Sequence, residues 1–576
     1  MMKPIKKTIL FAFISLFVFS SCDELLNVNS ERVVFPDEYD FTGANDTLFS
    51  MFGVLSQLEN LANTYVLLGE LRGDLMWLSN ESSAYLKEIH NFNISKSNPY
   101  VNQRDYYAII NNCNYIIQRI DTAVVRGNKQ VMMREFAACK AIRAWTYMQL
   151  ALNFGSVTYY EQPVLSVKDE GILKAKPKMT LEEIAPLLIR DILPYRDVEE
   201  PRLGILSNYN TNYSYFPIRA LLGDLYLWLG EYEQAAQAYY DLFYHSENFV
   251  IADNKYESYI EVLNNAFTNN YITSWSTIFT TDAGTEEFVT NLATSNEFGQ
   301  KFELDSLTSN QTLIPSKIAL DNWNNQIYYY SAELDTVGDL RKIGSVSLSN
   351  RALVRSSSDS ELENDDYYIY KYLSLNNPSV DFRNRAKQVL IYRKALLYLR
   401  YAEALNRAGK PNAAFAVIKN GLNSSNLSNR TVIPHRELER EIAETTVPSQ
   451  LDPAVDSIQY DTIYFPPKYM DFREYKFNNN IGIRMRGLGR VNMDTTHYVI
   501  PNLPSLQDSI LFVEDKIQEE LALETAFEGN RYHDLMRIAI RRDDNAYLAD
   551  KVAKNHPDDY NTIKDKLMIR ENWFIK

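Results

Sequence analysis

Residues 218–243, IRALLGDLYLWLGEYEQAAQAYYDLF, decide the fold class that this sequence predicts. Apolar residues recur every three or four positions on both sides of Gly230, which indicates two amphipathic helices, 218–229 and 234–243, joined by a tight turn. A small residue, Ala235, lies five positions after the glycine and would allow the two helices to approach closely. This pattern is typical of a tetratricopeptide-like helical hairpin.

A second hairpin follows the same pattern downstream. We expect helices over 395–408 and 412–422, with Gly409 in the turn and Ala414 again five positions after the glycine. The two units are not regularly spaced, so a tandem array is not predicted, and two unrelated helical hairpins are the alternative. Helical periodicity also marks other segments, over 45–61, 106–120, 131–152, 181–193, 513–527 and 531–540.

Two long segments, about 251–385 and 423–510, are rich in Asn, Ser, Asp and Tyr and lack a helical period. Short runs such as 457–465 and 497–500 have the composition of strands. Irregular segments of this length in a compact protein usually carry function. We therefore predict a mainly α protein of irregular tetratricopeptide-like helical hairpins, with long loop-rich, ligand-binding insertions that carry a few short strands. Residues 44–576 would form a single body, with its helical-repeat core at about 44–250, 386–422 and 511–545.

The N-terminus has the features of an export signal. Lysines at positions 3, 6 and 7 precede an apolar run over 9–19, which is too short to span a membrane. Two serines then precede Cys22, which indicates a lipid-modified cysteine. We expect residues 1–21 to be a lipoprotein signal peptide and 22–43 a lipid-anchored tether. An ordinary signal peptide followed by an unmodified cysteine is the alternative.

Charge and cysteine content narrow the class of protein further. Removal of residues 1–21 takes away three lysines and no acid, so the net charge changes from −15 to −18, which argues against nucleic acid as a partner. Besides Cys22, only Cys113 and Cys139 are present, both in helix-like runs. Free core cysteines are expected for both, and a bridge between neighbouring helices is the alternative.

No motif of a known catalytic centre is present in the sequence. H-E-x-x-H, G-x-S-x-G, P-loop and C-x-x-C patterns are absent, and the six histidines are scattered without ligand spacing. We therefore expect a binding protein without a metal or other cofactor. A surface glycosidase is the less favoured alternative, because it would need two carboxylates in one cleft, which a sequence cannot place.

Aromatic residues provide the best candidates for ligand contact, since the chain has 40 Tyr, 27 Phe and 6 Trp. Sugar recognition uses aromatic rings beside groups that bind hydroxyls through hydrogen bonds. For the tryptophans among these candidates, core packing is the alternative. The candidates are Arg72, Asp74, Trp77, Asn80 and Tyr85 in one polar stretch, Tyr271 and Trp275 in a second, and Trp323 in a third.

Charged residues near the C-terminus form a separate group. Glu528 and Arg531 are three positions apart, as are Asp534 and Arg537, so the members of each pair would face each other on a helix. We favour a structural role, in which an ion-pair network docks the C-terminal helix. A ligand-binding site is the alternative.

Several segments, in matching order, resemble the SusD/RagB family of outer-membrane lipoproteins. They begin with residues 22–28, CDELLNV, and include 143–157, 220–227 and 401–406. The most specific is 520–537, ELALETAFEGNRYHDLMR, which is similar to the family pattern ERxxELaFEGxRxxDLxR. The chain departs from the family at Thr158, where proline is usual, at Glu520, near which arginine is common, and in its final residues, which lack the family's usual tail. Its matching motif positions include Glu528, Gly529, Arg531, Asp534 and Arg537.

The resemblance implies a fold and a role. It implies helical hairpins with loop-rich insertions, and a non-catalytic protein anchored by its lipid to the outer membrane and facing the cell exterior. Such a protein acts as a lid on a SusC-like TonB-dependent transporter, to which it delivers oligosaccharides, or peptides in RagB-like members. Within the family, the segment at positions 72–85 often contributes to the binding face.

Overall fold

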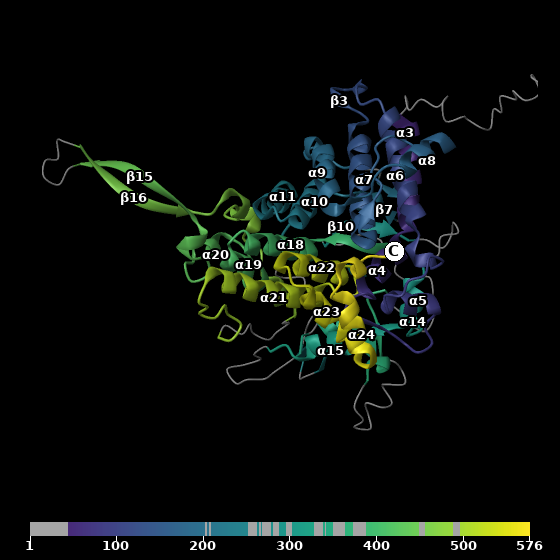
Figure 1. Ribbon diagram of the computed structural model, residues 1–576. Coiled ribbons are helices and arrows are strands. Elements are labelled where there is room, and N and C mark those ends of the chain that lie inside the picture. Colours follow the sequence, from purple (N-terminus) through teal and green to yellow (C-terminus); the bar gives the residue numbers. More distant parts are fainter. Residues whose placement is uncertain are drawn as a thin grey trace, which may run out of the picture.

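The computed structural model confirms the mainly α fold class in the residues that it describes. Helices form the body, and each described strand belongs to a two-stranded antiparallel pair (Figure 1). Cys22, the expected signal peptide and the expected tether lie outside the described residues. The described residues are 44–201, 204–206, 209–251, 262–263, 266–267, 278–279, 287–294, 302–327, 338–339, 341–348, 363–372, 388–448, 456–487 and 496–576.

The two expected helical hairpins are both present. The first pairs α10 (Ile218–Leu229) with α11 (Tyr232–His245), and the second pairs α18 (Lys394–Arg407) with α19 (Pro411–Lys419). Gly230 and Gly409 end their first helices with φ of 79° and 80°, the left-handed region that glycine adopts without strain. The alanines five positions after the glycines are fully buried, and α11 packs against α18, which joins the two hairpins in one core.

An N-terminal group of helices packs beside the first hairpin. Its long members were expected from periodicity, and α7 is buried over most of its length because helices and loops surround it. Cys113 and Cys139 are buried and free, as expected. The helices of this group are α3 (Ala44–Glu59), α4 (Ala62–Glu70), α5 (Ala84–His90), α6 (Gln103–Arg119), α7 (Met133–Phe154), α8 (Val167–Lys174) and α9 (Leu181–Ile192).

The C-terminal helices lie against the second hairpin and α4 (Figure 1). The helix expected over 513–527 is in fact α21 (Leu506–Glu524). It begins earlier because Ser505 caps it, accepting the backbone N–H of Asp508 at 3.1 Å. It ends earlier because Phe527 and Gly529 have φ of 71° and 90°. The helices that follow are α22 (Arg531–Arg542), α23 (Asn545–Ala553) and α24 (Tyr560–Leu567).

The described parts of the two insertions contain short helices and strands. The helices are α14 (Leu304–Ser309), α15 (Lys317–Asn324), α16 (Arg341–Ser345) and α20 (Ser424–Ser428).

The longer strand pairs are β1 (Met76–Leu78) with β11 (Leu313–Pro315), β10 (Phe288–Ala293) with β14 (Gln388–Arg393), and β12 (Val346–Leu348) with β13 (Tyr367–Ile369). Two-residue pairs are β2 (Val125–Arg126) with β3 (Lys129–Gln130), β4 (Ser156–Val157) with β5 (Met179–Thr180), β6 (Ile205–Leu206) with β7 (Tyr209–Asn210), and β8 (Val262–Leu263) with β9 (Ala266–Phe267).

A long hairpin of β15 (Glu439–Pro448) and β16 (Asp456–Phe465) projects from the body (Figure 1). The strand expected at 457–465 is therefore confirmed. The strand expected at 497–500 is wrong, because that segment makes a tight turn in which the backbone N–H of Val499 donates to the carbonyl of His497. On the hairpin, Ile442, Ile458 and Tyr460 are exposed and share one face.

The apolar core runs from α3 through the hairpins to the last residues of the chain. Among the described helices, none has the length and apolar character needed to cross a bilayer.

Candidate ligand-binding site

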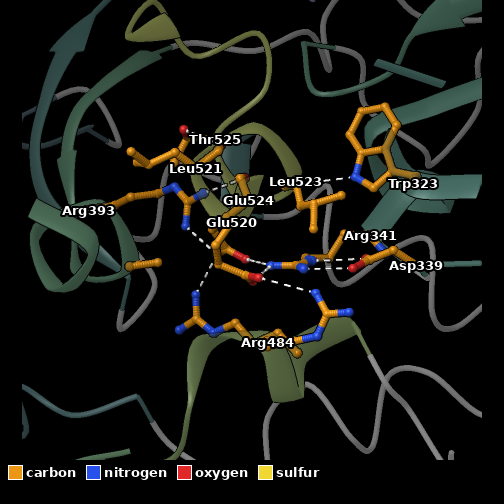
Figure 2. Close-up of polar contacts among 12 residues, drawn as sticks. Trp323, Asp339, Arg341, Arg393, Arg484, Glu520, Leu521, Leu523, Glu524 and Thr525 are labelled. Carbon is orange, nitrogen blue, oxygen red and sulfur yellow. Dashed lines mark hydrogen bonds and ion pairs between the residues drawn. The ribbon is translucent and has the colours of Figure 1, made fainter. Parts of the chain in front are cut away.

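A buried ion-pair network surrounds α21 (Figure 2). Glu520 and Glu524, both fully buried, project from this helix. Arg341 donates one guanidinium N–H group to Glu520 at 2.6 Å and to Glu524 at 2.8 Å. Arg393 and Arg486 each donate to Glu524 at 2.8 Å. Burial opposes ionisation of Glu524, but the three guanidinium groups outweigh it and hold the pKa of this carboxyl well below its ordinary value.

The cations of this network come from segments far from α21 in sequence. Arg341 and Arg486 belong to the two insertions, and Arg486 also donates to Glu287 in the first insertion. Lys371 donates to Glu528, which follows α21, at 2.6 Å. The network therefore fastens the bases of both insertions to the helical body. Removing one partner of such a buried pair typically costs about 3–5 kcal/mol, because the other charge stays buried and uncompensated.

The motif at 528–537 contributes to this packing in a way that its spacing only partly predicts. The Asp534–Arg537 pair forms at 2.9 Å, as expected. The expected Glu528–Arg531 pair is wrong, because α22 begins only at Arg531 and Glu528 lies before it. Arg531 instead donates to both carboxylate oxygens of Asp74, at 2.6 and 2.8 Å. All of these side chains are buried, which agrees with the structural role favoured from the sequence.

Gly529 allows the chain to turn between α21 and α22. Its φ is 90°, and a Cβ atom built on it would lie 2.7 Å from the Tyr65 ring. Glu70 receives the backbone N–H groups of this turn: its Oε1 accepts from Gly529 at 2.8 Å and from Asn530 at 3.1 Å. Burial raises the pKa of Glu70 to about 8, while these hydrogen bonds act in the opposite direction. The carboxyl also faces the N-terminus of α22, where the helix dipole favours a negative charge.

Several residues of this network were not singled out from the sequence. Lys371 interrupts the apolar run YYIYKYL, and Arg393, together with Lys394, interrupts VLIYRKALL. A cation within such a run was the one available signal. Glu70 likewise follows the apolar run YVLLG in α4. Nothing local marks the partners of these charges, since they lie far away in sequence.

Two of the expected ligand contacts, Arg72 and Asp74, are held inside the body. Arg72 donates to the carbonyl oxygens of Leu68 at 2.8 Å and Trp573 at 3.2 Å, and its guanidinium lies 4.3 Å from the centre of the Tyr532 ring. Asp74 is engaged by Arg531. Both side chains are buried, so they have packing roles in place of the surface contacts expected.

Trp323 is also a core residue. Its side chain has 0% exposure, and its indole N–H donates to the carbonyl of Leu523 at 3.1 Å (Figure 2). Its ring meets that of Phe527 at 5.9 Å between centroids. Trp323 therefore packs in the core, which was the alternative to ligand contact. Tyr271 and Trp275 lie outside the described residues.

The remaining candidates, Trp77, Asn80 and Tyr85, reach the surface within one short stretch. Trp77 is half-buried on β1, with its ring edge-on to His90 at 4.9 Å. Asn80 is exposed in the loop that follows, and Tyr85, on α5, is 42% exposed. The loop is held in place by Thr312, whose carbonyl accepts from the backbone N–H of Ser79 and the hydroxyl of Ser82. Two aromatic rings and an amide are therefore accessible within one short stretch of chain that Thr312 holds in place.

A small cavity of about 260 Å³ lies between residues 92–94 and the C-terminal residues 572–576, with Arg72 in its wall. Lys566 closes one side, since its ammonium donates to the carbonyl of Phe92 at 2.7 Å and to the side chain of Asn93 at 2.6 Å. The residues that the structure describes contain no group of three or more His, Cys, Asp or Glu side chains arranged to hold a metal ion.

Comparison with known proteins identifies the family. A model of the SusD family matches residues 321–447, which include the second helical hairpin and part of both insertions. Over these residues the chain matches the SusD/RagB family. The resemblance drawn from the motif at 520–537 is thereby confirmed.

Individual SusD-like proteins are similar along most of their length. A SusD-like protein of Formosa agariphila is 23% identical over 437 residues, which cover 70% of this chain and 79% of that protein. The crystal structure of a SusD superfamily protein from Bacteroides vulgatus has a TM-score of 0.60 at 13% identity, covering 93% of this chain and 96% of that one. A laminarin binding SusD-like protein has a TM-score of 0.50 at 15% identity, covering 89% and 93%. The structural likenesses establish a shared SusD-like fold.

Proposed function

We propose that this SusD-family protein is a non-catalytic surface lipoprotein that captures an oligosaccharide and passes it to a partner TonB-dependent transporter in the outer membrane. The observation that carries this function is the group formed by the half-buried Trp77 and the exposed Asn80 and Tyr85, in a fold shared with a laminarin binding protein. Aromatic rings stack on the apolar faces of sugar rings, and an amide can both donate to and accept from hydroxyl groups. One supported surface with both kinds of group suits a sugar chain.

The state of the carboxyl groups supports binding without catalysis. Glycosidic cleavage needs a carboxyl that can exchange a proton with the bound sugar. Glu520, Glu524 and Glu528 are instead buried and engaged by arginine or lysine. Glu70, whose pKa is raised to about 8, is buried and occupied by backbone N–H groups.

Titration of the mature protein with a ligand panel tests the binding function. We expect heat from neutral oligosaccharides, and at least about tenfold weaker binding after Trp77→Ala or Tyr85→Ala, because each removes a stacking surface. Tyr475→Ala is the matched control, since this tyrosine is 89% exposed elsewhere on the surface and its loss should leave affinity unchanged. Heat from peptides with none from sugars would favour the peptide-binding alternative, and cleavage of the bound sugar would establish an enzyme.

The anchor and the transporter are tested separately. We expect a palmitate analogue supplied to the native host to label the protein, and Cys22→Ser to abolish the label. The anchored protein should be cleaved when protease is added to intact cells and should co-purify with a TonB-dependent barrel. Labelling that survives Cys22→Ser, or protection from protease in intact cells, would contradict an acylated and outward-facing protein.

A further inference from the structure

A second cavity lies among the C-terminal helices. Its volume is about 520 Å³, in the range of small-molecule sites. Its walls come from α15, α21, α22 and α23, which lie close together in the lower part of Figure 1. Asp74, engaged by Arg531, forms part of its lining. The binding function proposed above does not use this cavity.

The charges that line the cavity do not cancel. Its three acids each have a cation partner: Asp74 has Arg531, Asp515 has Arg542 at 2.7 Å, and Glu519 has Lys516 at 2.7 Å. Two further lysines line the cavity, and neither forms an ion pair within the described part of the chain. These are Lys551 and Lys554, both on or next to α23. In a chain of net charge −15, this cavity therefore has a local excess of positive charge.

Lys551 is the more confined of the two lysines. It is half-buried, and its ammonium lies 5.2 Å from the centre of the Tyr547 ring. Burial and the neighbouring Arg531 lower the pKa of this ammonium, and the more distant charges of Asp74 and Asp515 offset this only in part. A partly desolvated cation that forms no direct ion pair is costly, and a bound anion would relieve that cost.

Neutral hydrogen-bonding groups of the cavity also have no partner. Gln518 lines the cavity and is 2% exposed, yet neither its amide nitrogen nor its amide oxygen makes a hydrogen bond to a described residue. The Tyr547 hydroxyl, in the same wall, is likewise buried and without a hydrogen-bond partner in the described residues. Buried polar groups are normally satisfied, so groups left open around one cavity point to a ligand that supplies both donors and acceptors.

We propose that this cavity binds a hydroxylated carboxylate of about the size of one acidic sugar unit. The ammonium groups of Lys551 and Lys554 face its carboxylate, while the Gln518 amide and the Tyr547 hydroxyl bind its hydroxyl groups. The choice of a sugar as the hydroxylated body rests on the proposed function. The preference for an anion rests only on the lining of the cavity.

Calorimetric titration with two matched sugars tests the site. D-Glucuronate and D-glucose differ at one carbon, which carries a carboxylate in the first and a hydroxymethyl group in the second. We expect the purified protein to bind glucuronate at least about tenfold more tightly, and this preference to shrink as salt is added, because ionic strength screens the attraction. Equal binding of the two sugars, or no binding of glucuronate, would overturn the site.

Paired variants locate the binding. Lys551→Met/Lys554→Met should weaken glucuronate binding at least about tenfold. Lys168→Met/Lys178→Met removes the same charge from exposed positions far along the chain and should leave it unchanged. Glucuronate binding that survives the first variant, or falls equally in the second, would overturn the assignment to this cavity.

Two further comparisons test the contacts to the hydroxyl groups and the independence of the two binding sites. Gln518→Met keeps the length of the side chain but removes the amide, so we expect weaker glucuronate binding with acetate binding unaffected. Acetate that binds as tightly as glucuronate would overturn the role of the hydroxyl groups. Tyr85→Ala should leave glucuronate binding at this cavity intact, because Tyr85 does not line it, so loss of neutral oligosaccharide binding and loss of this site are read independently.

Discussion

Arg393 and Glu528 form a two-pronged ion pair that joins β14 to the segment between α21 and α22. The Nε of Arg393 donates to Oε2 of Glu528 at 2.7 Å, and its Nη2 donates to Oε1 at 3.0 Å. Both side chains are buried, and Lys371 donates to the same carboxylate. The Glu528 carboxylate therefore holds Lys371, which belongs to the first insertion. It also holds Arg393, at the end of the strand that leads into the second helical hairpin.

Glu528→Gln should lower the free energy of unfolding by about 3–5 kcal/mol, because it leaves Arg393 and Lys371 buried without their counter-charge. Urea unfolding followed by circular dichroism measures the loss. Asp471→Asn is the control: it breaks the Asp471–Arg473 pair, whose side chains are 31% and 53% exposed, and should cost less than about 1 kcal/mol. Equal losses in the two variants would show that burial of the network does not matter to stability.

Gly529→Ala should destabilise the protein by about 2 kcal/mol or more. The new Cβ atom would meet the Tyr65 ring at 2.7 Å, and the backbone has φ of 90°. Gly127→Ala separates the two effects, since Gly127 has φ of 55° but no atom within 4 Å of an added Cβ. That variant should cost only about 1–2 kcal/mol from backbone strain. A thermal unfolding midpoint lower for Gly127→Ala than for Gly529→Ala would refute the close approach at Tyr65.

Stability should fall on acidification through two buried histidines. His90 and His556 stack with 4.1 Å between ring centroids, and the Nε2 atom of each has no hydrogen-bond partner among the described residues. Burial lowers the pKa of His90 to about 4 and that of His556 to about 3. Below pH 6.5 these two histidines bind protons in the unfolded chain but remain neutral in the folded protein. Stability is therefore lost as pH falls from about 6.5 to about 4.

The expected slope is about 1.4 kcal/mol per pH unit for each histidine over that range. Urea unfolding at pH values from 7.5 to 4.5 measures it. His556→Phe keeps a stacking ring but cannot take up a proton, so its slope should be shallower by about one proton. His245→Gln, at an exposed position, should keep the slope of the unchanged protein. The low pKa of Glu524 and of the buried His533 adds to acid destabilisation, whereas the raised pKa of Glu70 opposes it. These contributions are the same in all three proteins and cancel in the comparison.

Shortening the projecting hairpin should leave the body stable. Side chains such as Ile442, Ile458 and Tyr460 are exposed, so replacing residues 442–462 with a short Gly-Ser turn removes little buried surface. We expect the free energy of unfolding to change by less than about 0.5 kcal/mol. A drop in the unfolding midpoint by many degrees would show that the hairpin packs on the body more closely than its exposure indicates.

Helices were predictable from the sequence where their periodicity is local. Residues 218–229 form α10 as expected, because the apolar repeat, the glycine and the small residue after it act within one short stretch. The prediction of a strand at 497–500 failed because a strand does not depend on local sequence alone. Its composition suited a strand, but a strand also needs a partner beside it, and this segment instead turns on itself.

The candidate site was predictable only as a segment. Residues 72–85 were singled out together, yet Arg72 and Asp74 face the interior while Asn80 and Tyr85 reach the surface. A charge is usually expected in solvent, and here each is buried because a distant partner satisfies it. Trp323 is similar, since the carbonyl that accepts its indole N–H belongs to Leu523.

By itself, the sequence determined the helical hairpins, the family motif and the excess of negative charge, because each depends on residue type and short spacing. Only the tertiary structure decided which cation meets which carboxylate and which polar groups are left open around a cavity. Arg531 and Asp74 are 457 positions apart, and Arg393 and Glu528 are 135 apart. Pairing over such separations is set by how the helices pack, and no local pattern of residues records it.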